Sequence, residues 1–255
     1  MKIDKIHSLS TKDIFVDTNI LFKKLDGKQS EYYKLSKTKK FHASKFSILE
    51  FKRTLIKDCV SLYYLLLDNN NDLGMAYRRI NNMTENPQYK RQAANWITIL
   101  KVLGFPNKSE RSIIQKLRIL ITFGLESKFK ENVTFIDSVI KCDKIYIKPK
   151  KYKEGFLFKV GCGGCEKFHN SIERSVLENV YNVIHPIEKE NDVDKICLSL
   201  VKIIQNKEIE NHDCVMLGDI IISIDAPLEM PILTKDPHLV PICSSLNKEV
   251  ICLEK

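Results

Sequence analysis

The sequence predicts an α/β fold, a small and mainly parallel sheet flanked by helices. Two observations lead to this expectation: short apolar runs typical of strands alternate with longer stretches of helical spacing, and turn-forming residues separate the two kinds of segment. Strands separated by helices favour parallel pairing, because two parallel neighbours need a crossover connection between them. With 44% hydrophobic residues, the chain can bury a core of this kind.

The first half of the chain opens with a strand, a polar corner and a helix. Ile14-Phe15-Val16 is a short apolar run that stops at Asp17, and a new apolar turn begins at Ile20. A long helical pattern starts at Ser44 and stops at three asparagines, 69–71. In chain order we expect a strand at 14–16, a helix from about 20, a strand at 39–42, and helices at 44–67, 89–103 and 109–129.

The pattern changes near Asn132, where apolar residues begin to alternate. The runs 145–147 and 156–158 flank a lysine-rich turn, which is typical of a β-hairpin. For the rest of the chain we expect helices at 171–180, 193–204, 213–224 and 238–246, and strands at 183–187, 232–234 and 250–253. Residues 1–106 and 178–255 are expected to form one discontinuous domain, and residues 107–177 an inserted module that contains the hairpin.

Charge and composition narrow the function classes. The 255 residues include 41 Lys and Arg against 32 Asp and Glu, which gives a net charge of +9 and favours an anionic partner, nucleic acid first. No run approaches the roughly 18 uncharged residues of a membrane span, and the first 13 residues hold no apolar run typical of a secretory signal. We therefore expect a cytoplasmic protein without a membrane partner. Six of the eight cysteines lie in mostly apolar stretches and are interpreted as reduced thiols.

Three acids stand where a core is expected. Asp219 lies in the apolar helix CVMLGDIIISI, and Asp17 and Asp236 lie at or just past the ends of apolar strands. A lone buried carboxylate costs several kcal/mol or becomes protonated, and no basic residue lies within one helical turn of Asp219. Parallel strands end at one shared edge, where ligands of open α/β sheets bind. Acids that converge there predict a site for Mg²⁺ or Mn²⁺, which prefer oxygen ligands.

Each acid also has a local interpretation. Asp17 could cap the following helix, Asp236 could begin a turn, and Ser47-x-x-Glu50 matches a capping box. Taken together, however, the residues form an ordered set that resembles the PIN-domain nucleases. Its parts are Val16-Asp17-Thr18-Asn19-Ile20-Leu21, a helical Glu50 after Ser44, Gly218-Asp219-Ile220-Ile221 and Leu233-Thr234-Lys235-Asp236.

The resemblance implies a site and a chemistry. Its metal-binding acids would be Asp17, Glu50, Asp219 and Asp236, supported by the polar side chains of Thr18, Asn19 and Thr234. One or two Mg²⁺ or Mn²⁺ ions would activate a water for attack on a phosphodiester, and the family pattern implies 5′-phosphate and 3′-hydroxyl products.

Two features complicate the resemblance. Asp213 competes with Asp219 for the third acidic position, although six residues separate them, so they do not share one helix face. We prefer Asp219 as the ligand and keep Asp213 as a supporting residue, since it fits a helix start. The 168 residues between Glu50 and Asp219 exceed what the family usually places there, so an insertion must be accommodated.

The insertion carries a possible zinc knuckle. Cys162 and Cys165 lie in a glycine-rich turn followed by His169, and Cys142 could supply a fourth ligand. A second Cys-x-x-Cys is missing, so a plain glycine turn with two thiols remains the alternative.

The same region carries a basic hairpin. Aromatic residues alternate with lysines there, an arrangement suited to phosphates and stacked bases. The candidate nucleic-acid ligands are Lys148, Lys150, Lys151, Lys153 and Tyr152. The alternative is an edge hairpin that lysines protect from aggregation, and Arg78-Arg79 is interpreted as solvated surface.

The sequence therefore predicts a metal-dependent endonuclease, with single-stranded RNA favoured because the resembling family mostly acts on it. Two alternatives remain open: a non-catalytic nucleic-acid-binding protein with a vestigial acidic pocket, and a DNA-directed nuclease with the same site. The sequence does not identify an oligomeric or inhibitory protein partner.

Overall fold

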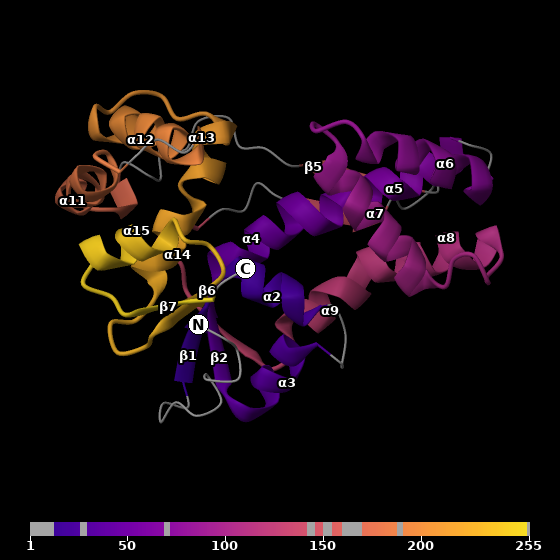
Figure 1. Cartoon of the computed structure of the whole chain (residues 1–255), viewed down its shortest axis with the longest axis horizontal. Helices are drawn as coiled ribbons and strands as arrows, with labels where there is room; N and C mark the ends of the chain where they lie inside the picture. Colours follow the sequence, from indigo (N-terminus) through magenta and orange to yellow (C-terminus); the bar gives the residue numbers. More distant parts are fainter. Residues whose placement is uncertain are drawn as a thin grey trace. The chain divides into compact units, whose positions relative to one another are not determined.

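The structure, a computed structural model, describes residues 13–25, 30–68, 72–141, 146–149, 155–159, 170–187 and 191–253. Within these residues, no helix combines the length and the apolar character needed to cross a bilayer. The chain divides into two compact units (Figure 1). Unit 1 comprises Met1–Glu50, Phe129–Ile145 and Val160–Lys255, and unit 2 comprises Phe51–Lys128 and Tyr146–Lys159.

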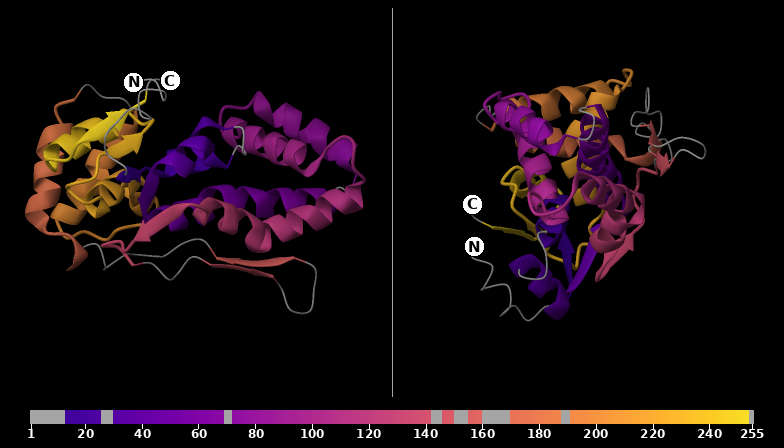
Figure 2. Two further views of the ribbon diagram at one scale, coloured as in Figure 1. Left: turned by 90° about the horizontal axis from the view of Figure 1, so that it is seen from below. Right: turned by 90° about the vertical axis from the view of Figure 1, so that its right-hand side faces the viewer.

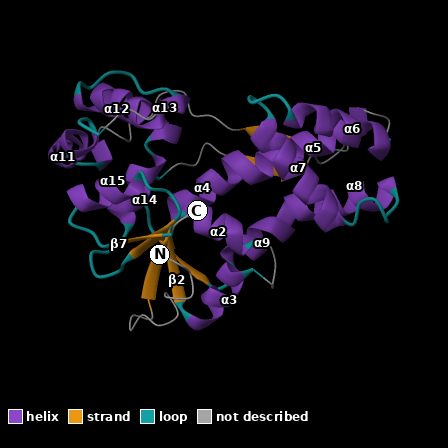
Figure 3. Ribbon diagram, viewed as in Figure 1, coloured by secondary structure: helices purple, strands orange, loops and turns teal. Residues whose placement is uncertain are grey.

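Unit 1 contains a five-stranded sheet in which every neighbouring pair is parallel (Figure 3). The sheet confirms the predicted α/β fold. Its strands, in the order β3-β2-β1-β6-β7, are β3 (Val133–Ile136), β2 (Lys40–Ser44), β1 (Asp13–Val16), β6 (Ile232–Thr234) and β7 (Val250–Cys252). The chain adds strands on one side of β1 first and on the other side later, so the switch point of the sheet lies between β1 and β6.

Helices flank this sheet and supply most of its core. They are α2 (Thr18–Lys24), α3 (Glu31–Thr38), α4 (Lys45–Phe51), α11 (Arg174–Ile184), α12 (Asn191–Ile204), α13 (Asn211–Met216), α14 (Gly218–Asp225) and α15 (Leu239–Ser245). One apolar cluster joins Phe15 and Ile232 of the sheet to the buried faces of α11, α12, α14 and α15. Burial of this cluster is the main favourable contribution to the folding of unit 1.

The prediction failed for the strand at 183–187. Helix α11 continues to Ile184 and is followed by a turn. Leu177, Val180 and Ile184 recur at spacings of three and four, so they form one buried helical stripe that overrides the local β-branched preference. The helix predicted at 213–224 is two helices, α13 and α14, that meet at Leu217.

Contacts at both ends align α4 with α14. Ser44, just before α4, donates a hydrogen bond to Asp225 at the end of α14, while Glu50 near the end of α4 lies against Gly218 at the start of α14. The two helices therefore run antiparallel. Lys248 Nζ donates to the carbonyls of Ser223, Ile224 and Ala226 at the C-terminal end of α14. The helix dipole favours a cation at this end. Glu50 and Asp219 are thus carried by adjacent helices.

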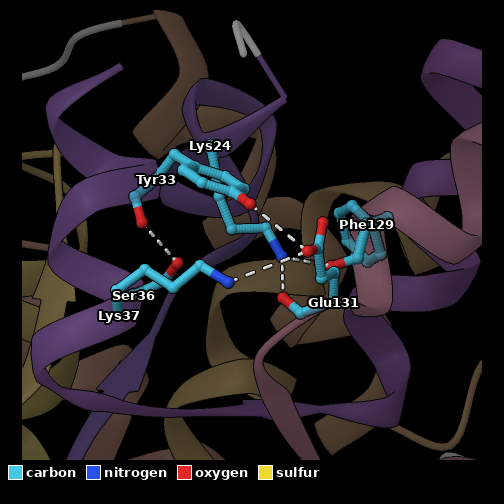
Figure 4. A network of polar contacts seen from close by, with 6 residues as sticks. All are labelled: Lys24, Tyr33, Ser36, Lys37, Phe129 and Glu131. Atoms are coloured by element: carbon cyan, nitrogen blue, oxygen red, sulfur yellow. Dashed lines mark hydrogen bonds and ion pairs between the residues drawn. The ribbon is translucent and has the colours of Figure 1, made fainter. Parts of the chain in front are cut away.

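A buried lysine holds α2 at its C-terminal end (Figure 4). Lys24 is 2% exposed, and its Nζ donates to the carbonyls of Phe129, at 2.8 Å, and Glu131. The Glu131 carboxylate in turn accepts from Tyr33 and lies 3.9 Å from Lys37 Nζ. Burial lowers the pKa of Lys24 to about 8, although the charge of Glu131 opposes this shift. The network ties α2 to the chain segment that enters β3.

Replacing Lys24 by methionine tests the burial of its ammonium group through the pH dependence of the free energy of unfolding. The folded-state pKa of about 8 lies below the ordinary 10.5 of the unfolded chain. The penalty for burying the ammonium is therefore fully present below pH 8 and is relieved as the pH rises toward 10.5. We expect the free energy of unfolding of wild type, relative to Lys24→Met, to rise by about 2–3 kcal/mol between roughly pH 7 and pH 10.

Chemical denaturation of both proteins at the two pH values measures this difference. Lys37→Met is the matched control, since the Lys37 side chain is half-exposed in the same network. A pH trend of equal size in Lys37→Met would contradict the role of burial.

Unit 2 is a helical unit with an attached hairpin. Its elements are the π-helical turn η1 (Lys52–Ile56), α5 (Lys57–Asp68), α6 (Leu73–Thr84), α7 (Lys90–Leu103), α8 (Glu110–Ile119), the π-helical turn η2 (Leu120–Gly124), the first residues of α9 (Leu125–Lys130), and the strands β4 (Tyr146–Pro149) and β5 (Phe156–Lys159). Strands β4 and β5 pair antiparallel, which confirms the predicted hairpin. Tyr64 of α5 anchors it by donating to the Phe156 carbonyl and accepting from the Phe156 amide.

The division into units differs from the predicted module at 107–177. Helices α5, α6 and α7 pack on one another, and α5 and α7 also pack on α8, so residues 51–106 join unit 2 rather than the sheet. Residues 129–145 and 160–177 belong to unit 1, where β3 completes the sheet and α11 packs on α12 and α15.

Candidate metal centre

Asp17 is the buried acid at the switch point of the sheet. It follows β1 and caps α2, where its Oδ1 accepts from the Thr18 amide at 2.5 Å. Its Oδ2 accepts from the Thr234 hydroxyl at 2.8 Å, so the ends of β1 and β6 are joined through this carboxylate. Burial raises the pKa of Asp17 to about 6, and the charge of Asp236 adds to this rise, while the bonds from Thr234 and Thr18 oppose it.

Thr234 links the polar residues that follow β1 and β6. Its hydroxyl donates to Asp17 and accepts from Asn19 Nδ2 at 3.3 Å and from the Asp236 amide at 2.9 Å. Asn19 Oδ1 also accepts from the Lys235 amide. The one proton and two lone pairs of the hydroxyl are thus all used. The supporting roles predicted for Asn19 and Thr234 correspond to these hydrogen bonds.

Glu50 reaches the same place from α4. Thr18 Oγ1 donates to Glu50 Oε2, and the other oxygen, Oε1, lies so near Gly218 that it would clash with a β-carbon at that position. The absence of a side chain at Gly218 therefore lets the carboxylate approach the start of α14. The capping box inferred from Ser47-x-x-Glu50 is not present, because the Glu50 carboxylate accepts from Thr18 and Ser47 lies inside the helix rather than before it.

Asp219 is more strongly perturbed than Asp17. Burial raises its pKa well above the usual range, and the negative charges of Asp17, Glu50 and Asp236 raise it further. Within the described part of the chain, the main causes of the raised pKa values of Asp17 and Asp219 are burial and neighbouring carboxylates, and no lysine or arginine is among these main causes. The neighbouring cation Lys235 lies 5.7 Å above the ring of Tyr32. The four acids predicted from the sequence therefore lie within electrostatic range of one another.

Asp236 is the fourth acid and lies in the loop after β6. Its Oδ1 accepts from the His238 amide at 3.0 Å, which forms the turn expected there, and its own amide donates to Thr234. The turn and the site are compatible, because this hydrogen bond leaves acceptor capacity on the carboxylate.

The chemistry of these donors fits a hard divalent cation. Four carboxylates supply only oxygen ligands, and their mutual repulsion is the kind of charge that Mg²⁺ or Mn²⁺ offsets. In the described residues, however, no three His, Cys, Asp or Glu side chains are arranged to ligate one ion. Asp17, Glu50 and Asp236 are held by hydrogen bonds to Thr18, Thr234 and His238. Coordination of an ion thus requires side-chain rotation within the cluster.

Asp213 belongs to a separate ion pair. Its carboxylate accepts from Lys202, from the Ser199 hydroxyl and from the Glu210 amide at the start of α13. Burial alone would raise the pKa of Asp213, but these partners outweigh burial and lower it. Asp213 is absent from the groups that act on Asp219, so the structure gives it a place in α13 and not in the acidic cluster.

Several predicted ligands lie outside the described residues. These are Cys142, Cys162, Cys165 and His169 of the zinc knuckle and Lys150, Lys151, Tyr152 and Lys153 of the basic turn. Lys148 lies in β4 of the predicted hairpin, and the structure describes its backbone.

The sequence did not reveal the role of Gly218. Replacing it by alanine places a methyl group against Glu50, which must move away from the cluster. Because alanine favours helix over glycine, we expect little loss of stability but a loss of Mn²⁺-dependent activity of about tenfold or more. Gly124→Ala is the matched control, since its β-carbon would meet only ordinary contacts at 3.5 Å. Equal activity of the two variants would contradict the role of the close approach.

A separate hollow of about 630 Å³ begins directly after Asp236. Pro237 and His238 form one wall, and apolar residues of α11, α12 and α15 form the others. None of the four acids lines it, so the cavity and the acidic cluster are different features.

Comparison with known proteins gave no match to a family model, to a curated protein or to a solved structure.

Proposed function

We propose that this protein is a metal-dependent endonuclease that hydrolyses phosphodiester bonds in single-stranded RNA. The observation that supports it best is the group of four acids at the switch point of the sheet, in which burial raises the pKa of Asp17 and of Asp219 and the neighbouring carboxylates raise both further. Asp213 differs from Asp17 and Asp219 in this respect, because its pKa is lowered and it forms an ion pair with Lys202. The resemblance to the PIN-domain nucleases favours RNA, and the net charge of +9 suits a polyanionic substrate.

The polar side chains of the site would have two roles: some would bind the metal, and others position the metal ligands. Asp17, Glu50, Asp219 and Asp236 would hold the metal, and a bound Mg²⁺ or Mn²⁺ would neutralise phosphate charge and lower the pKa of a water. Thr234 fixes Asp17 through Oδ2, while Thr18 fixes Glu50. Asn19 and the Asp236 amide orient Thr234 in turn. Thr18 and Thr234 thus hold the Glu50 and Asp17 carboxylates within the cluster, where rotation of the side chains would bring their remaining lone pairs to an ion.

The proposal is tested with end-labelled single-stranded RNA and Mn²⁺ or Mg²⁺. Wild type is expected to cleave internally and leave 5′-phosphate ends. Asp17→Asn preserves the shape of the side chain but removes its charge, and we expect cleavage to fall at least about 100-fold, more than the loss of a supporting group costs.

Three outcomes separate the alternatives. RNA binding without cleavage by either protein would favour the non-catalytic binding protein. Cleavage of single-stranded DNA in place of RNA would favour the DNA-directed nuclease. Equal cleavage by wild type and Asp17→Asn would show that the activity arises elsewhere or from a contaminant.

A further inference from the structure

The net positive charge of the chain comes from unit 2. Residues 51–128 and 146–159 contain 18 Lys and Arg against 7 Asp and Glu, a net charge of +11. The remaining residues, unit 1, contain 23 Lys and Arg against 25 Asp and Glu, a net charge of −2. The unit that holds the four acids therefore has no surplus of positive charge with which to attract a polyanion.

Three helices of unit 2 carry much of this charge. Together α6, α7 and α8 contain eight Lys and Arg and a single acid, Glu110. Each helix turns an apolar stripe inward, such as Ile80 in α6, Trp96 in α7 and Leu117 in α8. Most of the basic side chains are exposed on the other side, among them Arg78 and Arg111.

Most of the charges on these helices are not balanced locally, although Arg91 of α7 acts on the Asp58 carboxylate. Glu110 is partly buried and its carboxylate accepts from the Leu73 amide at the start of α6, so it serves as a helix cap. Among the described residues, the ion pair of unit 2 joins Lys52 to Glu126, and α6, α7 and α8 contribute none. Exposed helices usually alternate acids and bases at a spacing of four, which gains stability and avoids repulsion. A surface on which exposed bases outnumber exposed acids in this way is suited to a polyanion.

Apolar side chains accompany the basic residues. Phe123 in η2 is 62% exposed, and Ile119, one turn earlier, is 53% exposed. Strand β4 of the hairpin packs beside η2, which brings the lysine-rich hairpin to the same part of unit 2 (Figure 2). An exposed aromatic ring can stack on an unpaired nucleobase, whereas the bases of a duplex are already stacked on one another.

We propose that α6, α7, α8 and η2 form the RNA-binding surface of the protein, which grips the phosphate backbone of a single strand while Phe123 stacks on a base. This inference rests on the proposed function for its partner class, RNA. It assigns binding to the helices of unit 2, including Arg78, and not to the hairpin alone. Each phosphate contact with a single strand contributes about −0.7 to the slope of log K against log salt.

The experiment uses the full chain with Asp17→Asn, without divalent metal, so that binding is measured apart from cleavage. The triple variant Arg78→Gln, Lys101→Gln and Arg111→Gln removes one exposed charge from each helix. The control triple Lys34→Gln, Lys40→Gln and Lys207→Gln removes three exposed charges from unit 1. Fluorescence anisotropy with a labelled, unstructured RNA of about 20 nucleotides gives K over a range of salt concentrations.

We expect the unit 2 triple to weaken binding at least about 25-fold near 0.1 M salt and to flatten the salt slope by about 1.4, which corresponds to two lost phosphate contacts. The control triple is expected to change K less than about twofold. Phe123→Ala is expected to weaken binding by about fivefold or more without changing the slope, because stacking releases no counterion.

Equal losses in both triples would mean that affinity follows total charge, and no loss in either would mean that another surface binds; both results overturn the inference. Binding to anionic vesicles but not to RNA would make a membrane surface the partner and would also overturn it. RNA binding through unit 2 by a chain that never cleaves would refute the proposed function alone. Cleavage by wild type that is unaffected by the unit 2 triple would refute this inference alone.

Discussion

Replacing Asp219 by asparagine is expected to stabilise the metal-free protein and to abolish its activity. The substitution removes a carboxylate whose pKa is raised by burial and by three like charges, so the folded state loses a repulsion that the unfolded chain does not have. We expect a gain of about 1–2 kcal/mol, or roughly 2–8 °C in Tm, as for other relieved functional sites. Cleavage of RNA is expected to fall at least about 100-fold.

Asp213→Asn is the matched control for this prediction. It makes the same chemical change one helix earlier, but Asp213 is paired with Lys202 and its pKa is lowered. Its removal should therefore decrease Tm, by up to several degrees, while activity per folded molecule stays close to wild type. Thermal unfolding in the presence of a chelator measures both variants. A lower Tm in Asp219→Asn would contradict the repulsive cluster and favour a structural carboxylate.

Adding Mn²⁺ or Mg²⁺ at neutral pH is expected to stabilise the wild-type protein strongly. An ion that binds the folded state alone stabilises it by RT ln(1 + [M²⁺]/Kd), or about 2.7 kcal/mol at one hundred times Kd. The reason lies in the site, because one ion would offset the repulsion that Asp17, Glu50 and Asp236 exert on the buried carboxylate of Asp219. Thermal unfolding at increasing metal concentration measures the effect without RNA.

The double variant Asp17→Asn and Asp219→Asn separates this site from other ion-binding surfaces. It keeps the shape of both side chains and removes two of the four charges, so its Tm should respond weakly to either metal. Ca²⁺ provides a second comparison, because it takes six to eight ligands at longer distances than Mg²⁺. An equal rise in Tm for wild type and the double variant would place the bound metal elsewhere.

The acids of the cluster were predictable because they violate the local pattern. Asp17 and Asp236 each follow an apolar strand, and a parallel sheet brings such ends to one edge whatever the details of packing. Asp219 lies among isoleucines, so a carboxylate at this position needs a partner from elsewhere in the fold. Glu50 carries no comparable signal in its own sequence. The position of Glu50 in the cluster depends on the packing of α4 beside α14, where Glu50 contacts Gly218. The local sequence does not encode this tertiary contact.

Other features depend on packing that no local pattern encodes. The predicted strand at 183–187 failed because the apolar stripe of α11 extends through Ile184. The division at Phe51 was missed because one helical pattern runs from Ser44 to Leu67 without a break, although Glu50 and Phe51 belong to different units. Lys24 resembles an ordinary surface lysine in sequence and is buried only because Phe129 and Glu131 offer their carbonyls.

The hydrogen bonds of the Thr234 hydroxyl restrict the proton chemistry of Asp17. Since Asn19 and the Asp236 amide occupy both lone pairs of the threonine, its proton is directed at Asp17 alone and cannot be turned elsewhere. Each oxygen of Asp17 thus already receives one donor from the chain and faces the remaining space with lone pairs only. Such a carboxylate can offer electron pairs to an ion but is poorly placed to relay protons, and serine, which keeps the hydroxyl, is the replacement at position 234 that would preserve this polarity.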